Sequence, residues 1–254
     1  MTLLINQFYL NPLVSINWLS ENLNAANLVV LDVSLESNVA TIEIAFPRIQ
    51  IKGARYFDLK RTFSDLENPL PNTLPNPEAF AFACRNLGIN NNSTIVVYDN
   101  IGIYASPRVW WMFKSMGHKN IAVLDGGLPA WKNKNYPTES IQTRELPEGN
   151  FKALFNSNFQ KSASQILENI ASKEAIVIDA RSNERFFGLV PESRKNLKSG
   201  HIPNAVNLPF LEVLKDGKFI PLNEISAIFK KLKIDNQPKI FTCGSGLTAC
   251  VLIL

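Results

Sequence analysis

The chain repeats one order of secondary structure, and this repeat constrains its fold more than any other feature. In each half a helix precedes two short apolar strands, which are followed by a helix, a third strand and a further helix. The expected elements are residues 16–23, 28–32, 54–58, 77–87, 95–99, 106–116 and 121–124 in the first half, and 162–171, 176–179, 205–208, 222–232, 240–242 and a helix from Ser245 in the second. Apolar strands that alternate with helices favour parallel sheets covered on both faces. We therefore expect two tandem three-layer α/β/α domains.

Residues 135–162 are rich in Pro, Glu, Asn and Ser and show no periodicity, which is typical of a connector. We expect a first domain over residues 1–136, a linker over 137–161 and a second domain over 162–254. The first half continues past Asp99 through a helix and a strand, whereas the chain stops soon after residue 243. We expect the second domain to lack its last strand, as in a shortened member of its family.

Composition excludes several classes of protein. Three scattered cysteines form no disulfide framework, and two histidines without a Cys-x-x-Cys pair offer no metal site. Residues 1–6 have no basic segment of a signal peptide, and no apolar run approaches the length of a membrane span. The net charge of +4 is dispersed, which suits a small anion better than nucleic acid or a membrane. We expect a cytoplasmic monomer.

The most reactive segment begins at Cys243, where an apolar strand ends. Gly244 and Gly246 free the backbone, so that successive N–H groups can turn toward the sulfur, and the expected helix adds the positive end of its dipole. Both effects favour the thiolate. An inert buried cysteine is the alternative, but the Gly-Ser-Gly loop favours function. Aligned repeats place Asp99 at the position of Cys243, so that the first domain is catalytically silent.

A cysteine phosphatase is excluded by the loop itself. Such an enzyme needs one more loop residue and an arginine that closes the loop around phosphate, whereas the corresponding position here is Ala249. Phosphate would therefore lack its bidentate clamp.

Duplicated motifs carry a resemblance to a known family. They lie at residues 53–58, 106–113 and 124–131 in the first half, and at 179–181, 200–203, 205–210 and 243–248 in the second. Over nearly its whole length the chain resembles the two-domain sulfurtransferases of the rhodanese superfamily. The resemblance implies that Cys243 accepts a sulfane sulfur, holds it as a persulfide, and passes it to a thiol, cyanide or thioredoxin-like acceptor without a cofactor.

The loop also resembles one type within that family. Cys-Gly-Ser-Gly, an aliphatic residue and Thr resemble the 3-mercaptopyruvate type, whereas thiosulfate enzymes carry basic residues directly after the cysteine. The resemblance makes Cys243 and Ser245 catalytic, with Ser245 assisting proton transfer. It assigns substrate binding to Arg185, Arg194, Gly244, Gly246, Leu247 and Thr248. Solvated arginines and a turn-forming serine are the alternatives; guanidinium groups nevertheless suit a 2-oxo carboxylate.

One departure from the family concerns a proton relay. Where the family usually has a histidine, this sequence has Asn72, and the position of the histidine's acidic partner matches Lys60 or Arg61. We therefore expect no Ser-His-Asp relay. We expect His201 to be structural and Cys250 to pack in the core.

Three functions from different classes remain open. The first is a sulfurtransferase that uses 3-mercaptopyruvate or, alternatively, thiosulfate with cyanide as acceptor. The second is a rhodanese-like binding module without turnover. The third is a truncated product that folds only in its first half.

Overall fold

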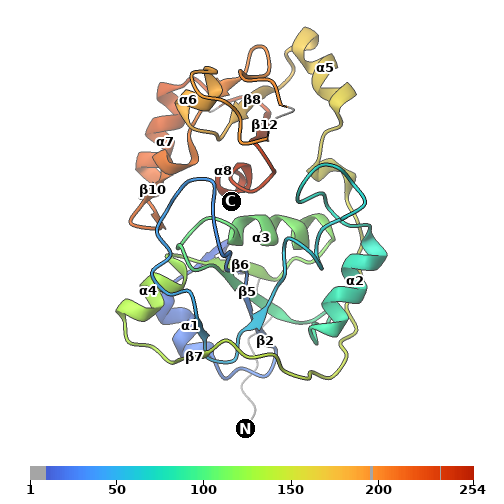
Figure 1. The fold of residues 1–254 in the computed structure, drawn as a ribbon, viewed down its shortest axis with the longest axis vertical. Coiled ribbons are helices and arrows are strands. Elements are labelled where there is room, and N and C mark those ends of the chain that lie inside the picture. The colour runs from blue at the N-terminus through green and yellow to red at the C-terminus, as the bar shows by residue number, and fades with distance from the viewer. Residues whose placement is uncertain (1–9, 195–196, 235) are drawn as a thin grey trace. The chain divides into compact units, whose positions relative to one another are not determined.

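A computed structural model describes residues 10–194, 197–234 and 236–254 (Figure 1). Residues 1–6, which we compared with a signal peptide, lie outside the described residues. The chain forms two compact units: unit 1 is Met1–Asn156 with Asp216–Lys218, and unit 2 is Ser157–Lys215 with Phe219–Leu254. Each unit contains a parallel sheet and helices, which confirms the predicted α/β class.

The sheet of unit 1 has five parallel strands in the order β1-β6-β5-β2-β4. These strands are β1 (Leu13–Val14), β2 (Leu28–Asp32), β4 (Arg55–Tyr56), β5 (Thr94–Tyr98) and β6 (Ile121–Leu124). β2 and β5 pair in register from Leu28 opposite Thr94 to Asp32 opposite Tyr98. Because parallel strands end at the same edge of a sheet, Asp32 and Asp99 reach that edge together.

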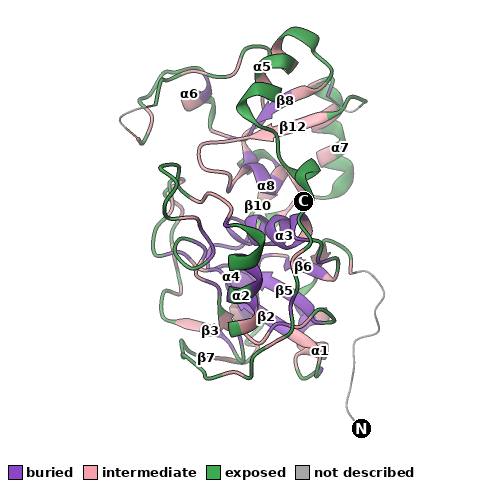
Figure 2. Cartoon of the chain, turned by 90° about the vertical axis from the view of Figure 1, so that its right-hand side faces the viewer, coloured by how far each residue is buried: buried purple, intermediate pink, exposed green. Residues whose placement is uncertain are grey.

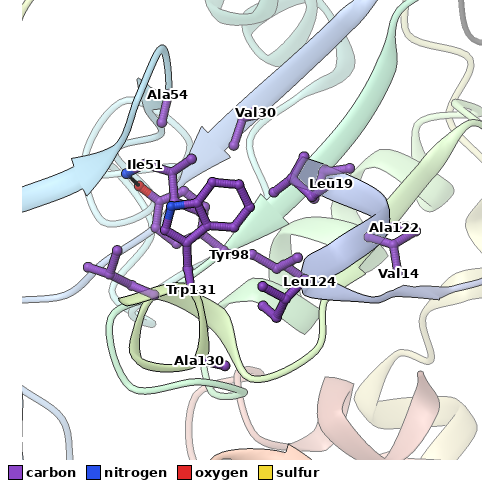
Figure 3. Packing of buried hydrophobic residues seen from close by; sticks show 13 residues of the cluster. Val14, Leu19, Val30, Ile51, Ala54, Tyr98, Ala122, Leu124, Ala130 and Trp131 are labelled. Atoms are coloured by element: carbon purple, nitrogen blue, oxygen red, sulfur yellow. Dashed lines mark hydrogen bonds between the residues drawn. The ribbon is translucent and has the colours of Figure 1, made fainter. Parts of the chain in front are cut away.

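Helices cover both faces of this sheet. They are α1 (Ile16–Asn22), α2 (Pro77–Asn86), α3 (Ser106–Ser115) and α4 (Gly127–Asn133). On one face, alternate strand residues such as Val30 and Leu124 pack with Leu19 of α1 and Trp131 of α4 (Figure 3). α2 and α3 pack together through Phe80 and Phe113, whose ring centroids are 5.1 Å apart. The result is the expected three-layer arrangement.

Unit 1 also includes part of the expected linker. β7 (Thr138–Ser140) pairs antiparallel with β3 (Ile49–Ile51), and Phe151 is 1% exposed. The backbone N–H of Phe151 donates to the carbonyl of Ile89. Residues 137–156 therefore pack on unit 1, whereas we expected the linker to extend over 137–161. A single aromatic anchor and a three-residue strand leave no periodic signal in the sequence.

The sheet of unit 2 has three parallel strands in the order β12-β8-β9. They are β8 (Ile176–Asp179), β9 (Val206–Asn207) and β12 (Lys239–Thr242). This order matches β5-β2-β4 of unit 1, and the described residues of unit 2 form no strand on the other side of β12. A short pair, β10 (Leu214–Lys215) and β11 (Lys218–Phe219), forms a two-stranded sheet of its own.

The described residues of unit 2 contain four α-helices. They are α5 (Ala163–Ser172), α6 (Asn183–Phe186), α7 (Leu222–Lys231) and α8 (Ala249–Ile253), with short 3-10 helices at η1 (Ser157–Phe159) and η2 (Phe210–Val213). α5 begins with a capping box between Ser162 and Gln165. No residue of α5 or α7 is fully buried, and both helices are largely green in Figure 2, whereas α8 is mostly purple.

We predicted that the last helix begins at Ser245, and this first residue is wrong. α8 begins at Ala249, and residues 244–247 form bends instead. Gly246 has a φ of 76°, a left-handed conformation that interrupts a right-handed helix. No helix in the described part of the chain is long and apolar enough to cross a lipid bilayer.

Candidate active site

Cys243 follows the last residue of β12 and is half-buried. Its Sγ accepts a hydrogen bond from the backbone N–H of Gly246 at 3.2 Å. The loop thus turns an N–H toward the sulfur, as we expected from the glycines. The five-residue helix α8 begins six residues after Cys243, so its dipole is a weaker influence than the sequence indicated.

The corresponding loop of unit 1 shows how many hydrogen-bond donors a loop of this shape can direct at a side chain at its start. Asp99 follows β5 as Cys243 follows β12, and its carboxylate is buried. Gly102, with a φ of 122°, occupies the place of Gly246 and donates its N–H to Asp99 Oδ1 at 3.1 Å. The other donors to the Asp99 carboxylate are the N–H groups of Ile101, Tyr104, Ala105 and Ser106 and the hydroxyl of Ser106, at 2.7 to 3.1 Å. The loop of unit 1 is therefore a complete anion cradle, filled by its own side chain.

The two predicted arginines both approach Gly244. Arg194 donates from Nη2 to the Gly244 carbonyl at 2.6 Å. A Cβ atom added to Gly244 would lie 2.8 Å from Arg185 Nη2 and 3.6 Å from Arg185 Cζ. The structure thus gathers Arg185, Arg194 and the Cys243 loop at one place, although these residues are far apart in the sequence.

A network of charges that the sequence did not suggest holds Arg185. Glu192, whose side chain is 2% exposed, binds Arg185 through Nε at 3.3 Å and Nη2 at 2.5 Å. The same carboxylate binds Arg181 Nη1 at 2.8 Å, and Arg181 is paired with Asp179 at the end of β8. Glu192 carries no periodicity or motif signal, so only the three-dimensional structure could reveal its role in this network.

Charge pairing shifts the acid–base properties of this network. The hydrogen bond to Asp179 raises the pKa of Arg181, and burial only partly opposes it. Burial would raise the pKa of Glu192, but the hydrogen bond from Arg185 and the charges of Arg185 and Arg181 together hold it below its ordinary value. Glu192 is therefore ionised at neutral pH, and the network alternates in charge.

The remaining predicted site residues have varied positions. Ser245 and Thr248 are partly exposed in the loop, whereas the side chain of Leu247 is buried. Leu247 can therefore offer a ligand only its backbone. Cys250 is buried, and its thiol donates to the Gly246 carbonyl at 3.3 Å. Cys250 thus packs beneath the loop, as expected.

His201 and Asn72 have structural contacts. The ring of His201 stacks on the Phe186 ring with centroids 3.9 Å apart, and its Nδ1 lies 2.9 Å from the Phe186 carbonyl oxygen. Because a carbonyl oxygen can only accept a hydrogen bond, Nδ1 carries the proton in this contact. Asn72, in unit 1, has a φ of 56° and accepts from Arg108 Nη2 through its carbonyl. Among the described residues, no group of three or more His, Cys, Asp or Glu side chains could hold a metal ion.

Comparison with known proteins agrees with the duplicated architecture. The Rhodanese-like domain family matches twice, over residues 15–134 and 162–252. The chain belongs to the rhodanese family. The two matches cover most of both units and include the Cys243 loop as well as the Asp99 loop.

Curated rhodanese relatives include enzymes named for two different sulfur donors. The 3-mercaptopyruvate sulfurtransferase of Mus musculus is 39% identical and covers 95% of this chain and 84% of its own length. The thiosulfate sulfurtransferase of Mus musculus is 37% identical and covers 99% and 87%. These similarities identify the protein as a sulfurtransferase. The sequence identities to the two relatives are too close to show which sulfur donor this protein uses.

A solved rhodanese structure has the same fold. The crystal structure of SseA, a 3-mercaptopyruvate sulfotransferase from Escherichia coli, aligns with a TM-score of 0.83 at 34% identity. The alignment covers 96% of this chain and 92% of SseA. The predicted tandem rhodanese-like fold is therefore confirmed.

Proposed function

We propose that the protein transfers a sulfane sulfur from 3-mercaptopyruvate to an acceptor through a persulfide on Cys243. The observation that carries this proposal is the filled cradle of unit 1. A carboxylate oxygen of Asp99 lies two bonds beyond Cβ, and so does the outer sulfur of a cysteine persulfide. Both groups are anions. The loop around Asp99 binds a carboxylate through six hydrogen-bond donors. By analogy, the related loop after Cys243 binds the anionic outer sulfur of a persulfide.

The proposed reaction has two displacements on sulfur. The Cys243 thiolate attacks the sulfur of 3-mercaptopyruvate, a new S–S bond forms and the C–S bond breaks. The electron pair of that bond leaves as the enolate of pyruvate, which takes up a proton. An acceptor thiolate or cyanide then attacks the outer sulfur, and Cys243 leaves as a thiolate. No redox partner or metal ion is needed, because the electrons balance within these steps.

The residues around the loop favour a 2-oxo carboxylate donor. Thiosulfate is a compact dianion whose charges lie beside the transferred sulfur, and the residues that follow Cys243 here are Gly244 and Ser245, which carry no charge. The carboxylate of 3-mercaptopyruvate lies further from its sulfur, where Arg185 can meet it as a planar two-donor partner. We propose Ser245 as the group that assists proton transfer to the leaving enolate.

Thiosulfate is the second candidate donor, because the thiosulfate sulfurtransferase is almost as similar as the 3-mercaptopyruvate enzyme. We propose a thiol, including that of a thioredoxin-like protein, or cyanide as acceptor, and a monomeric protein in the cytoplasm.

The test is sulfur loading of Cys243. Incubation with 3-mercaptopyruvate should increase the mass of the protein by one sulfur atom, and cyanide should remove that atom as thiocyanate. Cys243→Ser should abolish the mass increase, whereas Cys250→Ser should retain it. A wild-type protein that folds but never gains sulfur from either donor would instead be a binding module.

Limited proteolysis tests whether unit 2 is folded. A stable fragment that ends within residues 135–162 would support a product folded only in its first half. A full-length protected chain would refute it.

A further inference from the structure

Glu192 occupies one defined edge of Arg185. A guanidinium group has two edges that can each hold a carboxylate: the side edge formed by Nε and Nη2, and the end edge formed by Nη1 and Nη2. Glu192 binds the side edge at both nitrogens. Arg185 Nη1 makes no hydrogen bond to any other residue in the described part of the chain. No carboxylate of the described residues therefore occupies the end edge, and the Arg185 side chain is 20% exposed.

The other side of Glu192 is fixed to the sheet. Glu192 Oε1 also binds Arg181, which forms hydrogen bonds with both carboxylate oxygens of Asp179 at the end of β8. Arg181 further donates to the Gly200 carbonyl at 2.8 Å. Glu192 is thus a buried anion between two cations, one anchored to the rigid sheet and one beside the Cys243 loop.

From these contacts we propose that Glu192 is the positioning residue that aims the free end edge of Arg185 at the carboxylate of the sulfur donor. This inference rests on the proposed function, because it assigns the donor carboxylate to Arg185. Arg185 has a long flexible side chain, and an unrestrained guanidinium would sample many rotamers. Glu192 removes that freedom before the donor binds, and it leaves vacant the edge that suits a carboxylate.

The test compares Glu192→Gln in two backgrounds. The glutamine keeps the size of the side chain and removes its charge. In the wild-type background, KM for 3-mercaptopyruvate should rise about tenfold, the size of effect expected when a charge-assisted hydrogen bond is weakened. kcat should change little, because the lost interaction is made in the ground state and the transition state alike. In an Arg185→Gln background, adding Glu192→Gln should change KM less than about twofold, because no guanidinium remains to be aimed.

A matched control is Glu184→Gln. Glu184 precedes Arg185 in α6 and is exposed, so its loss should leave KM unchanged. Equal effects of Glu192→Gln in both backgrounds would show that Glu192 only stabilises the fold and would overturn the proposal. A wild-type KM in Glu192→Gln would overturn it as well.

A separate measurement distinguishes failure of this inference from failure of the proposed function. Pyruvate carries the 2-oxo carboxylate but no transferable sulfur, and calorimetry can follow its binding without turnover. Glu192→Gln should weaken pyruvate binding about tenfold in the same background-dependent way. If wild-type protein takes up no sulfur yet binds pyruvate with this dependence, the proposed function fails and the positioning role stands. If wild-type protein takes up sulfur and Glu192→Gln binds pyruvate normally, only the positioning role fails.

Discussion

The carbonyl oxygen of Asp99 occupies the space that a side chain on Gly127 would need. A Cβ atom added to Gly127 would lie 2.5 Å from this oxygen and 2.7 Å from the Gly102 carbonyl oxygen. The next N–H, that of Leu128, donates to the same Asp99 carbonyl at 3.0 Å. The start of α4 therefore closes over the loop after β5, and only a glycine permits this approach.

We predict that Gly127→Ala destabilises unit 1 by about 3 kcal/mol, through backbone strain at a φ of 51° and through the collision with Asp99. Gly53→Ala is a matched control, because Gly53 has a φ of 82° but nothing within 4 Å of an added Cβ. It should lose only about 1 kcal/mol from strain. All four tryptophans and all five tyrosines lie in the part of the chain that forms unit 1, so urea titration followed by tryptophan fluorescence reports on this unit. Equal losses for both variants would contradict the contact.

We predict that Asp99→Ala destabilises unit 1 by roughly 3 to 5 kcal/mol, because it leaves five buried N–H groups without their acceptor. Asp99→Asn should lose less, since one amide oxygen can still accept from part of the cradle. The same fluorescence-detected titration measures both. An alanine variant as stable as wild type would mean that water replaces the carboxylate without penalty.

Gly244→Ala should weaken binding of 2-oxo carboxylates, because the new methyl group meets the Arg185 guanidinium at 2.8 Å. Gly244 has no positive φ, so alanine brings no backbone strain here. We expect KM for 3-mercaptopyruvate to rise by about tenfold, the fold-change that corresponds to roughly 1.4 kcal/mol. In an Arg185→Ala background the same change should have little effect. An equal effect in both backgrounds would place the damage in the loop itself.

The stability of unit 1 should fall in mild acid because of His118. Burial is the largest cause that lowers the pKa of His118, and the nearby charge of Lys114 lowers it further, whereas hydrogen bonds to the backbone of Ser93 and Asn120 only partly oppose this shift. The unfolded chain therefore binds a proton near the ordinary value of about 6.5, while the folded chain does not. The free energy of unfolding should decline as pH falls from that value toward the folded pKa.

His118→Phe tests this expectation. The ring of His118 lies 5.8 Å from Phe113 and 5.7 Å from Phe151, measured between centroids, so phenylalanine fits an aromatic environment. The difference in stability between about pH 7.5 and about pH 5 should shrink in this variant. An unchanged difference would assign the acid sensitivity to carboxylates instead.

Apolar runs with clear ends were the most predictable part of the fold. The strands at residues 28–32, 121–124 and 176–179 match β2, β6 and β8 residue for residue. α4 was not predicted, because its first residue is Gly127 and its N-cap is Gly126 with a φ of 85°. Glycines usually end helices rather than begin them, so tertiary contact with the Asp99 loop decides this element.

The candidate site was predictable only where one segment carries it. The loop after Cys243 could be identified because strand, glycines and cysteine are adjacent in the sequence. Arg185, which lies beside this loop, is bound by Glu192, and that contact joins side chains without any shared period. The late start of α8 was missed for a local reason, since the sequence does not show that Gly246 adopts a left-handed conformation.

The filled cradle around Asp99 also shows how a stable analogue of the persulfide state could be made. An aspartate in place of Cys243 would place a permanent negative charge two bonds beyond Cβ, where the outer sulfur of the persulfide would stand. Such a variant could neither take up nor release sulfur. It would be a stable imitation of the charged intermediate, suited to capturing an acceptor protein before transfer occurs.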